Sequence, residues 1–159
     1  MKAAFAWVEK SEKHDLTVRI EEYTFYQLGS ECMILRFSRP LLGMTEVHGR
    51  FADAFFTEDE RYLVLKDPYF VALVDMETEA AFHHMRPDPW WVGRIEIEDG
   101  QLSGNYYQLE PKRVEKVMTP IALTDVPTLW QPGLGGIENG RMGTAHEPFI
   151  NFLLQNEKE

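Results

Sequence analysis

The chain has 159 residues, of which 44% are hydrophobic and 26% charged, and its formal net charge is -10. This composition is typical of one globular domain, and the acidic excess argues against binding DNA or RNA, which depends on Lys and Arg contacting phosphate. No apolar run approaches the roughly 18 residues of a membrane helix, and the apolar start is too short for a secretory signal. We therefore expect a cytoplasmic protein that does not enter a membrane.

We expect a single domain over residues 1–159. N-terminal antiparallel strands occupy 1–38, a central meander and hairpin occupy 51–108, and an irregular segment with a C-terminal helix occupies 109–159. Residues 51–110 carry thirteen acidic and four basic residues, whereas acidic and basic residues are nearly equal in number in the rest of the chain. This focus of negative charge favours a basic protein partner, although acidic turns can also serve only to keep a β protein soluble.

The first fifty residues predict antiparallel strands over 3–8, 16–23 and 32–37. The second of these has the clearest period-2 alternation, which indicates a sheet with one solvated face. Residues 38–49 contain one proline and two glycines, and we expect a loop there.

Four apolar runs follow, over residues 51–57, 62–66, 70–76 and 80–84, and short acidic or proline-containing segments separate them. Such spacing is typical of consecutive antiparallel strands. Both alternating faces of the two inner runs are apolar, so these strands need cover on both faces. We expect the N-terminal sheet and the C-terminal helix to provide it. The predicted fold is mainly β, an antiparallel meander or sandwich of about nine strands with a short C-terminal helix packed on it.

The turns of this meander carry most of its acidic residues. In consecutive hairpins the first and third turns lie at the same end of the sheet, so their side chains are expected to gather there. We call this group the acidic rim and predict that it contacts the partner. Its members are Glu58, Asp59, Glu60, Glu77 and Glu79. The step from Asp67 to Pro68 predicts a tight turn at the opposite end.

The segment FFTEDERYLVLKDPYFVALVDMETEAAF resembles one blade of a WD-repeat β-propeller. The matching residues are 54–57, 61–65, Val74, Asp75 and Thr78. The resemblance covers about a fifth of the chain and does not recur, whereas a propeller needs several blades of roughly 40 residues. The length excludes a closed propeller, and we transfer no function from the resemblance.

A hairpin is predicted over residues 91–108, because two strand-like runs flank Asp99-Gly100, a two-residue turn that favours type I′ geometry. One face of the hairpin is apolar and the other is polar. The expected cross-strand pairs are Ile97 with Leu102, Ile95 with Gly104, and Gly93 with Tyr106.

Trp90, just before this hairpin, and Trp91, its first residue, are further candidates for the partner surface, because tryptophan is enriched at interface hot spots. Consecutive strand residues send one ring inward and one outward. The alternative is that neighbouring loops cover both rings.

The C-terminal third predicts a short helix over 111–118, a glycine- and proline-rich loop over 127–143, and a final helix over 148–155. No metal site or cofactor is expected. His83 and His84 are strand neighbours that point to opposite faces, so they are poorly placed to share one metal ion. The glycine-rich loop lacks the lysine of a P-loop, and no catalytic motif is present.

Two functions from different classes remain. The first is an acidic protein-binding domain, such as an inhibitor of the immunity-protein type or a sequestering partner of a basic protein. The second is a small enzyme or ligand-binding β domain with a pocket lined by aromatic side chains and by His83 or His84. The absence of catalytic motifs favours the first, and a deep polar pocket would favour the second.

Overall fold

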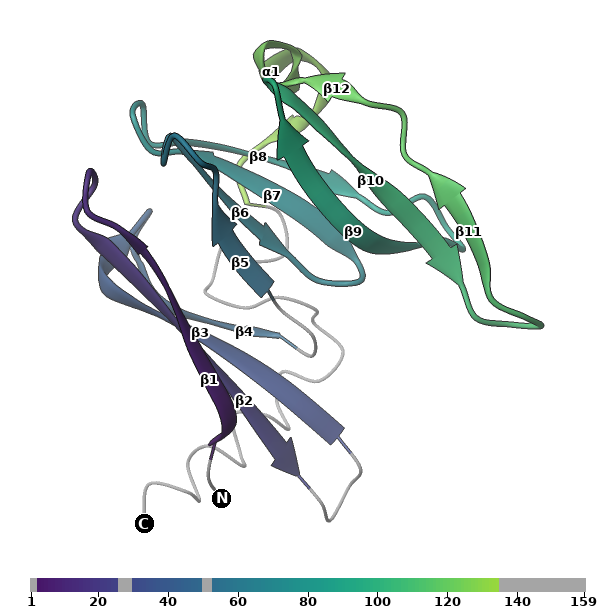
Figure 1. Ribbon diagram of the computed structural model, residues 1–159, viewed down its shortest axis with the longest axis horizontal. Helices are drawn as coiled ribbons and strands as arrows, with labels where there is room; N and C mark the ends of the chain where they lie inside the picture. Colours follow the sequence, from purple (N-terminus) through teal and green to yellow (C-terminus); the bar gives the residue numbers. More distant parts are fainter. Residues whose placement is uncertain (1–2, 26–29, 50–52, 135–159) are drawn as a thin grey trace.

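The computed structural model describes residues 3–25, 30–49 and 53–134 (Figure 1). These residues form thirteen strands in three antiparallel sheets, with one short helical segment near residue 126. The first sheet has the strand order β1-β2-β3-β4. Its strands are β1 (Ala3–Ser11), β2 (Leu16–Phe25), β3 (Ser30–Leu41) and β4 (Met44–Gly49).

The second sheet holds the predicted central meander. Its order is β13-β8-β7-β6-β5, so the four predicted runs pair as consecutive hairpins. All four predicted strands are confirmed, with ends that differ by at most two residues. Their bounds are β5 (Asp53–Phe56), β6 (Tyr62–Lys66), β7 (Phe70–Asp75) and β8 (Ala80–Met85), and the short β13 (Gln131–Pro132) pairs with the free edge of β8.

The third sheet is built around the predicted hairpin. β9 (Trp91–Glu98) pairs with one edge of β10 (Gln101–Gln108), and β11 (Val114–Val117) and β12 (Ile121–Ala122) pair with the other edge. A 3₁₀ turn, η1 (Leu123–Asp125), and a single helical turn, α1 (Val126–Leu129), follow.

The second sheet is the middle layer of three, and buried apolar side chains cover both of its faces. Alternate residues of β6 and β7 face the first sheet, and the intervening residues face the third sheet. On the first side, Leu63, Leu65, Ala72 and Val74 pack with Leu16, Val18, Ile20 and Leu35; on the second, Val64, Val71 and Leu73 pack with Val92, Ile95, Leu102, Val126 and Trp130. The prediction of cover on both faces is confirmed. The second cover comes from the third sheet and α1, and the helix predicted over 148–155 lies outside the described residues.

The loop predicted over 38–49 is wrong. β3 continues to Leu41 and turns through Leu42 and Gly43, which both have positive φ, into β4. The register between β3 and β4 shifts between Arg36 and Leu41, so Pro40 lies within this irregularity. Proline is tolerated in a strand at such a position because no ladder hydrogen bond is needed from it.

The C-terminal third also differs from its prediction. Residues 114–117 form β11 and not a helix. A helix of two turns is marginally stable by itself, whereas the edge of β10 provides hydrogen-bond partners for the backbone of an added strand. Within the loop predicted over 127–143, α1 and β13 are regular structure as far as Pro132. Residues beyond 134 lie outside the described part of the chain.

A bulge in β9 changes the predicted register of the hairpin. The pairs Ile97 with Leu102 and Ile95 with Gly104 are confirmed, but Tyr106 pairs with Val92 and not with Gly93. Gly93 and Arg94 together therefore oppose Asn105 alone. This two-against-one arrangement is a β-bulge, which bends the strand and frees backbone polar groups.

Candidate functional site

Three turns meet at one end of the central sheet. The β5–β6 and β7–β8 turns carry the acidic rim, and the β9–β10 turn joins them from the third sheet (Figure 1). A hollow of about 430 Å³, which we call the rim hollow, lies between the β5–β6 and β9–β10 turns. Its lining residues are Thr57, Glu58, Asp59, Tyr62, Ile97, Glu98, Asp99, Gly100 and Leu123.

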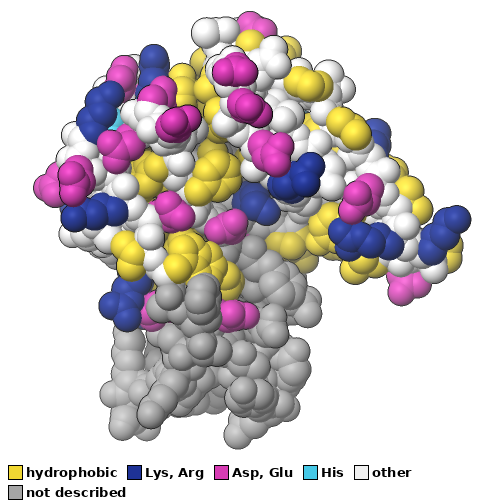
Figure 2. Space-filling model, in the orientation of Figure 1, with side chains coloured by type: hydrophobic (Ala, Val, Ile, Leu, Met, Phe, Trp, Pro, Cys, Tyr) yellow, Lys and Arg dark blue, Asp and Glu magenta, His cyan; other side chains and the backbone are white. Residues whose placement is uncertain are grey.

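The rim hollow combines an apolar floor with acidic walls. Tyr62, Ile97 and Leu123 belong to the apolar cluster between the second and third sheets, and each is partly exposed. Figure 2 shows acidic side chains along the upper part of the molecule with hydrophobic side chains exposed between them. A Lys or Arg side chain matches such a surface, because its alkyl stem packs on apolar groups while its charged end meets carboxylates.

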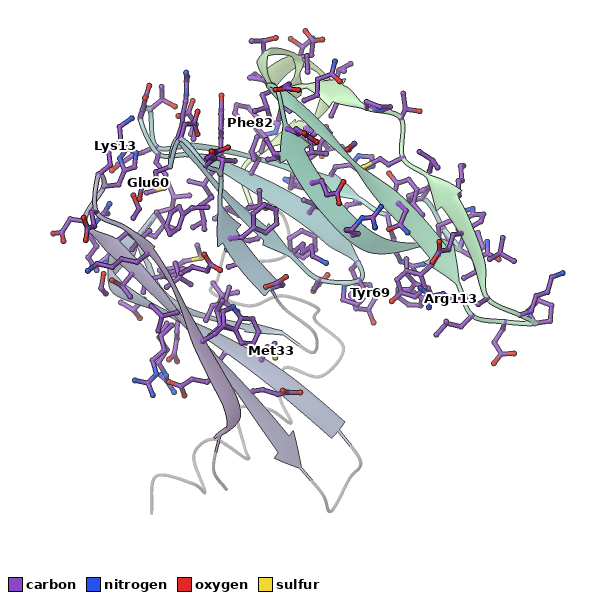
Figure 3. All side chains as sticks on the ribbon, viewed as in Figure 1. Lys13, Met33, Glu60, Tyr69, Phe82 and Arg113 are labelled. Carbon is purple, nitrogen blue, oxygen red and sulfur yellow. The ribbon has the colours of Figure 1, made fainter. Side chains whose placement is uncertain are left out.

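Basic side chains already neutralise one side of the acidic rim. Glu77 lies 3.6 Å from Lys13 Nζ, at the tip of the β1–β2 hairpin, and 3.7 Å from Arg61 Nε. Arg61 also bonds Asp75 at 3.2 Å. In Figure 3, Lys13 and Glu60 lie at this same end of the molecule. The β7–β8 side of the rim is therefore held in an ion-pair network.

The other side of the rim retains its charge. Asp59 accepts hydrogen bonds from Thr57 Oγ1 (2.7 Å) and Arg61 N (3.0 Å), and these bonds, the Thr57 bond foremost, hold its pKa below the usual range. In the part of the chain that the structure describes, five further carboxylates at this end form no ion pair. They are Glu58, Glu60, Glu98, Asp99 and, on the β7–β8 turn, Glu79.

Three of the acidic turn residues have a left-handed backbone. Glu60, Glu79 and Asp99 have φ values of 60°, 55° and 52°. Glycine adopts this conformation freely, whereas other L-residues pay roughly 1–2 kcal/mol for it. Acidic side chains thus occupy turn positions where glycine would be less strained.

The two predicted tryptophans lie at the opposite end of the sheet, beside Tyr69, which Figure 3 labels. Trp91 contacts the edge of Tyr69 at a centroid distance of 5.2 Å, and the Arg86 guanidinium stacks 4.1 Å above the Trp91 ring. Trp90 packs on the second apolar cluster, with Lys116 Nζ 5.6 Å from its ring centre. Both rings are half-buried and engaged by neighbours, and neither joins the acidic rim.

His83 and His84 point to opposite faces of β8, as predicted. His83 Nδ1 lies 3.0 Å from the carbonyl oxygen of Gly133. His84 Nε2 lies 2.9 Å from Tyr106 Oη, and its ring stacks on Trp130 at 5.7 Å. Burial, together with the neighbouring His83, lowers the pKa of His84.

A second hollow of about 210 Å³ adjoins these histidines. Its lining residues are His83, His84, Met85, Leu129, Trp130 and Gln131. No carboxylate lines it, and no group of three potential metal ligands occurs within the described residues. Sequence patterns missed Trp130 and Gln131, because β13 had no strand signal that would place them beside β8.

The predicted turn at Asp67 holds an unusual carboxylate. Asp67 Oδ1 accepts hydrogen bonds from Tyr69 N (2.7 Å) and Phe70 N (3.2 Å), which confirms the turn. The side chain is buried, and Oδ2 has no hydrogen-bond partner. Burial raises the pKa of Asp67 to about 6.

Comparison with known proteins finds no matching family model, no similar curated protein and no similar solved structure. No helix among the described residues is long and apolar enough to cross a bilayer.

Proposed function

We propose that this protein is a cytoplasmic binding protein that inhibits or sequesters a basic protein, in the manner of an immunity protein. The acidic rim and the β9–β10 turn form the contact surface. A Lys or Arg side chain of the partner enters the rim hollow, with its stem on Tyr62 and Ile97 and its charged end beside Glu58 and Glu98.

One observation carries this proposal. Among the described residues, four carboxylates without ion pairs line the rim hollow, and they come from two turns far apart in the sequence. They are Glu58, Asp59, Glu98 and Asp99, and the floor between them is apolar. The positive φ of Glu60 adds support, because backbone strain is retained at a turn position where an acidic side chain is presented. Facing charges of opposite sign steer association and make it sensitive to salt.

The test is capture of partners from the native host on the immobilised full-length chain at low and high salt. A triple variant, Glu58→Gln with Glu98→Gln and Asp99→Asn, should lose the captured basic protein. The matched control removes three exposed charges elsewhere, through Asp15→Asn, Asp88→Asn and Glu110→Gln. Equal capture by both triple variants, or capture that salt does not weaken, would contradict the proposal.

A second candidate is a binding site for a small ligand at the histidine hollow. His83 and His84 have fixed orientations there, and Trp130 and Gln131 lie beside them. A small planar ligand with a hydrogen-bonding edge fits this chemistry. Titration of a fragment set, followed through the imidazole signals of His83 and His84, should identify it. Gln131→Leu should weaken binding of this ligand but leave capture of a basic protein by the acidic rim unchanged.

A further inference from the structure

β11 is an edge strand, and no other strand among the described residues pairs with its outer edge. All four of its side chains are exposed, and Val117 is 79% exposed. It pairs with β10 along one edge, and in Figure 1 it lies at the outer margin of the third sheet. Edge strands with free backbone groups are sites where another extended segment can add to a sheet.

The backbone of β11 fixes which residues offer hydrogen bonds to such a segment. Met118 N donates to Gly104 O at 2.9 Å, so the polar groups of residue 118 point toward β10. Because these groups alternate along an antiparallel strand, those of Lys116 and Val114 also point inward. The N–H and C=O groups of Glu115 and Val117 therefore point outward along the free edge.

We propose that β11 is the docking edge for an extended segment of a partner protein, which adds to the third sheet as an antiparallel strand. This surface is distinct from the acidic rim and goes beyond the function proposed above. The outward groups of Glu115 and Val117 form the backbone hydrogen bonds, and the exposed side chains of β11 select the sequence of the added strand.

The charges on β11 define that sequence. Directly opposite side chains of unlike charge stabilise a strand pair, and like charges destabilise it. The segment therefore places a basic residue opposite Glu115 and an acidic residue opposite Lys116, with apolar residues opposite Val114 and Val117. Read along the partner chain, the pattern is apolar, acidic, basic, apolar.

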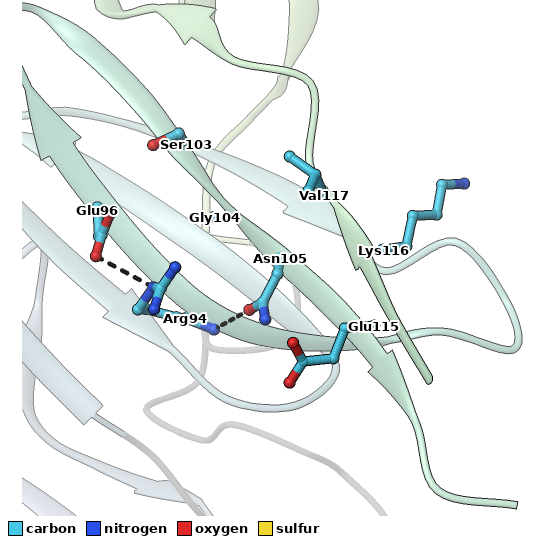
Figure 4. A pocket seen from close by; sticks show the side chains of 8 residues that line it. All are labelled: Arg94, Glu96, Ser103, Gly104, Asn105, Glu115, Lys116 and Val117. Atoms are coloured by element: carbon cyan, nitrogen blue, oxygen red, sulfur yellow. Dashed lines mark hydrogen bonds and ion pairs between the residues drawn. The ribbon is translucent and has the colours of Figure 1, made fainter. Parts of the chain in front are cut away.

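A hollow beside Glu115 is lined by side chains of both charges. It has a volume of about 270 Å³ and lies over the outer face of the third sheet, where Arg94 and Lys116 line it together with Glu96 and Glu115 (Figure 4). Glu96, whose carboxylate bonds Arg94 Nε at 3.1 Å, stands on its far side. A Lys side chain opposite Glu115 reaches the Glu115 carboxylate, which Arg113 Nη2 also contacts at 3.0 Å, at the margin of this hollow. The remaining lining residues are Ser103, Gly104, Asn105 and Val117.

A second copy of the chain fits this edge poorly. In a pair of antiparallel copies of β11, a residue whose backbone groups point outward must lie opposite another such residue. Only two registers meet this condition and still pair three residues of each copy. One register sets Lys116 opposite Lys116 of the other copy, and the other sets Glu115 opposite Glu115. Both place like charges in direct contact, and this favours a different protein as the occupant.

The test uses the full-length ¹⁵N-labelled chain and the peptide acetyl-Thr-Ile-Glu-Lys-Val-Thr-amide, which has the expected pattern. Binding should shift the amide signals of Glu115 and Val117. N-methylation of the peptide lysine, whose N–H faces β11, should weaken binding about tenfold, as the loss of one strong hydrogen bond predicts. N-methylation of the peptide glutamate, whose N–H faces away, should leave it unchanged. Equal binding of the two methylated peptides would overturn the proposal.

A protein variant provides an independent check. Val117→Pro removes an outward N–H but leaves the ladder with β10, because an edge strand tolerates proline where its N–H faces solvent. This variant should keep its melting temperature and lose the peptide. If the wild-type chain dimerises in sedimentation equilibrium and Val117→Pro is monomeric, the occupant is a second copy and the proposed partner is wrong.

Discussion

Lys66 Nζ donates a hydrogen bond of 2.9 Å to the carbonyl oxygen of Gly93, and so joins the middle layer to the bulge of the third sheet. The same bulge exposes the amide of Arg94, which donates to Asn105 Oδ1 at 2.7 Å (Figure 4). Two side chains thus satisfy the backbone groups that the bulge removes from the ladder. The bulge is held in place from both of the sheets that it contacts.

Replacement of Lys66 should therefore destabilise the protein. Lys66→Met keeps the alkyl stem but leaves the Gly93 carbonyl without its donor, at an expected cost of about 1–2 kcal/mol in the free energy of unfolding. Urea denaturation measures this. Lys10→Met, at a side chain that is 61% exposed, is the matched control and should change stability by less than about 0.5 kcal/mol. Equal effects would show that the Gly93 bond contributes nothing.

Asp67 should make stability depend on pH between about 4 and 6. Burial raises its pKa from the usual 3.8 to about 6, so the folded state keeps this proton at pH values where the unfolded chain has lost it. The stabilisation is present below pH 4 and lost as pH rises through 6, a change of about 3 kcal/mol. Asp67→Asn does not titrate and should lack this component. Parallel stability profiles of the two proteins would contradict the prediction.

His84 should give the opposite dependence. Burial lowers its pKa below the usual 6.5, so the neutral ring is favoured in the folded state. Its contribution to stability is present above pH 6.5 and is lost as pH falls through the folded-state pKa. NMR titration of the imidazole measures that value directly. Tyr106→Phe, which removes the hydroxyl partner, should cost about 1 kcal/mol at neutral pH.

Gly104 should tolerate no side chain. A Cβ at this position would collide with the backbone carbonyl of Arg94 across the bulge, and the backbone cannot yield as a flexible side chain can. We expect Gly104→Ala to cost about 1–3 kcal/mol. Gly100→Ala is the control, because that site has positive φ but open space, so its cost should be limited to about 1 kcal/mol. Thermal denaturation of both variants separates collision from backbone strain.

The left-handed acidic residues should be replaceable at a gain in stability. Glu60→Gly and Glu79→Gly relieve positive φ and should each raise the free energy of unfolding by about 0.5–1 kcal/mol. Glu58→Gly, in the same turn but without positive φ, should lower it. If the proposed function is correct, Glu60→Gly also weakens capture of the basic partner, which would show that stability was given up for binding.

Much of the middle layer could be predicted because its signals are local. The alternation in residues 62–75 sets the faces of two strands, and the apolar character of both faces requires two covering layers. The Asp67 and Asp99 turns also follow from side chains and glycine within a few residues of each other.

The remaining features arise from contacts between distant segments. The bulge at Gly93 depends on Lys66 and Asn105, and the position of β11 depends on a free edge of β10. The rim hollow depends on packing of the β9–β10 turn against the β5–β6 turn, so Glu98 and Asp99 were not grouped with Glu58 from the sequence. Periodicity describes one strand at a time, and therefore it encodes none of these juxtapositions.

β7 is buried at five of its six residues and contributes to both apolar clusters. A larger side chain at Ala72 would press on the first sheet, whereas one at Val71 would press on the third. Only a rigid peptide plane separates these two positions. Displacement of one outer layer is therefore transmitted to the other through the thickness of a single strand, and this links the first sheet mechanically to the bulge and to β11.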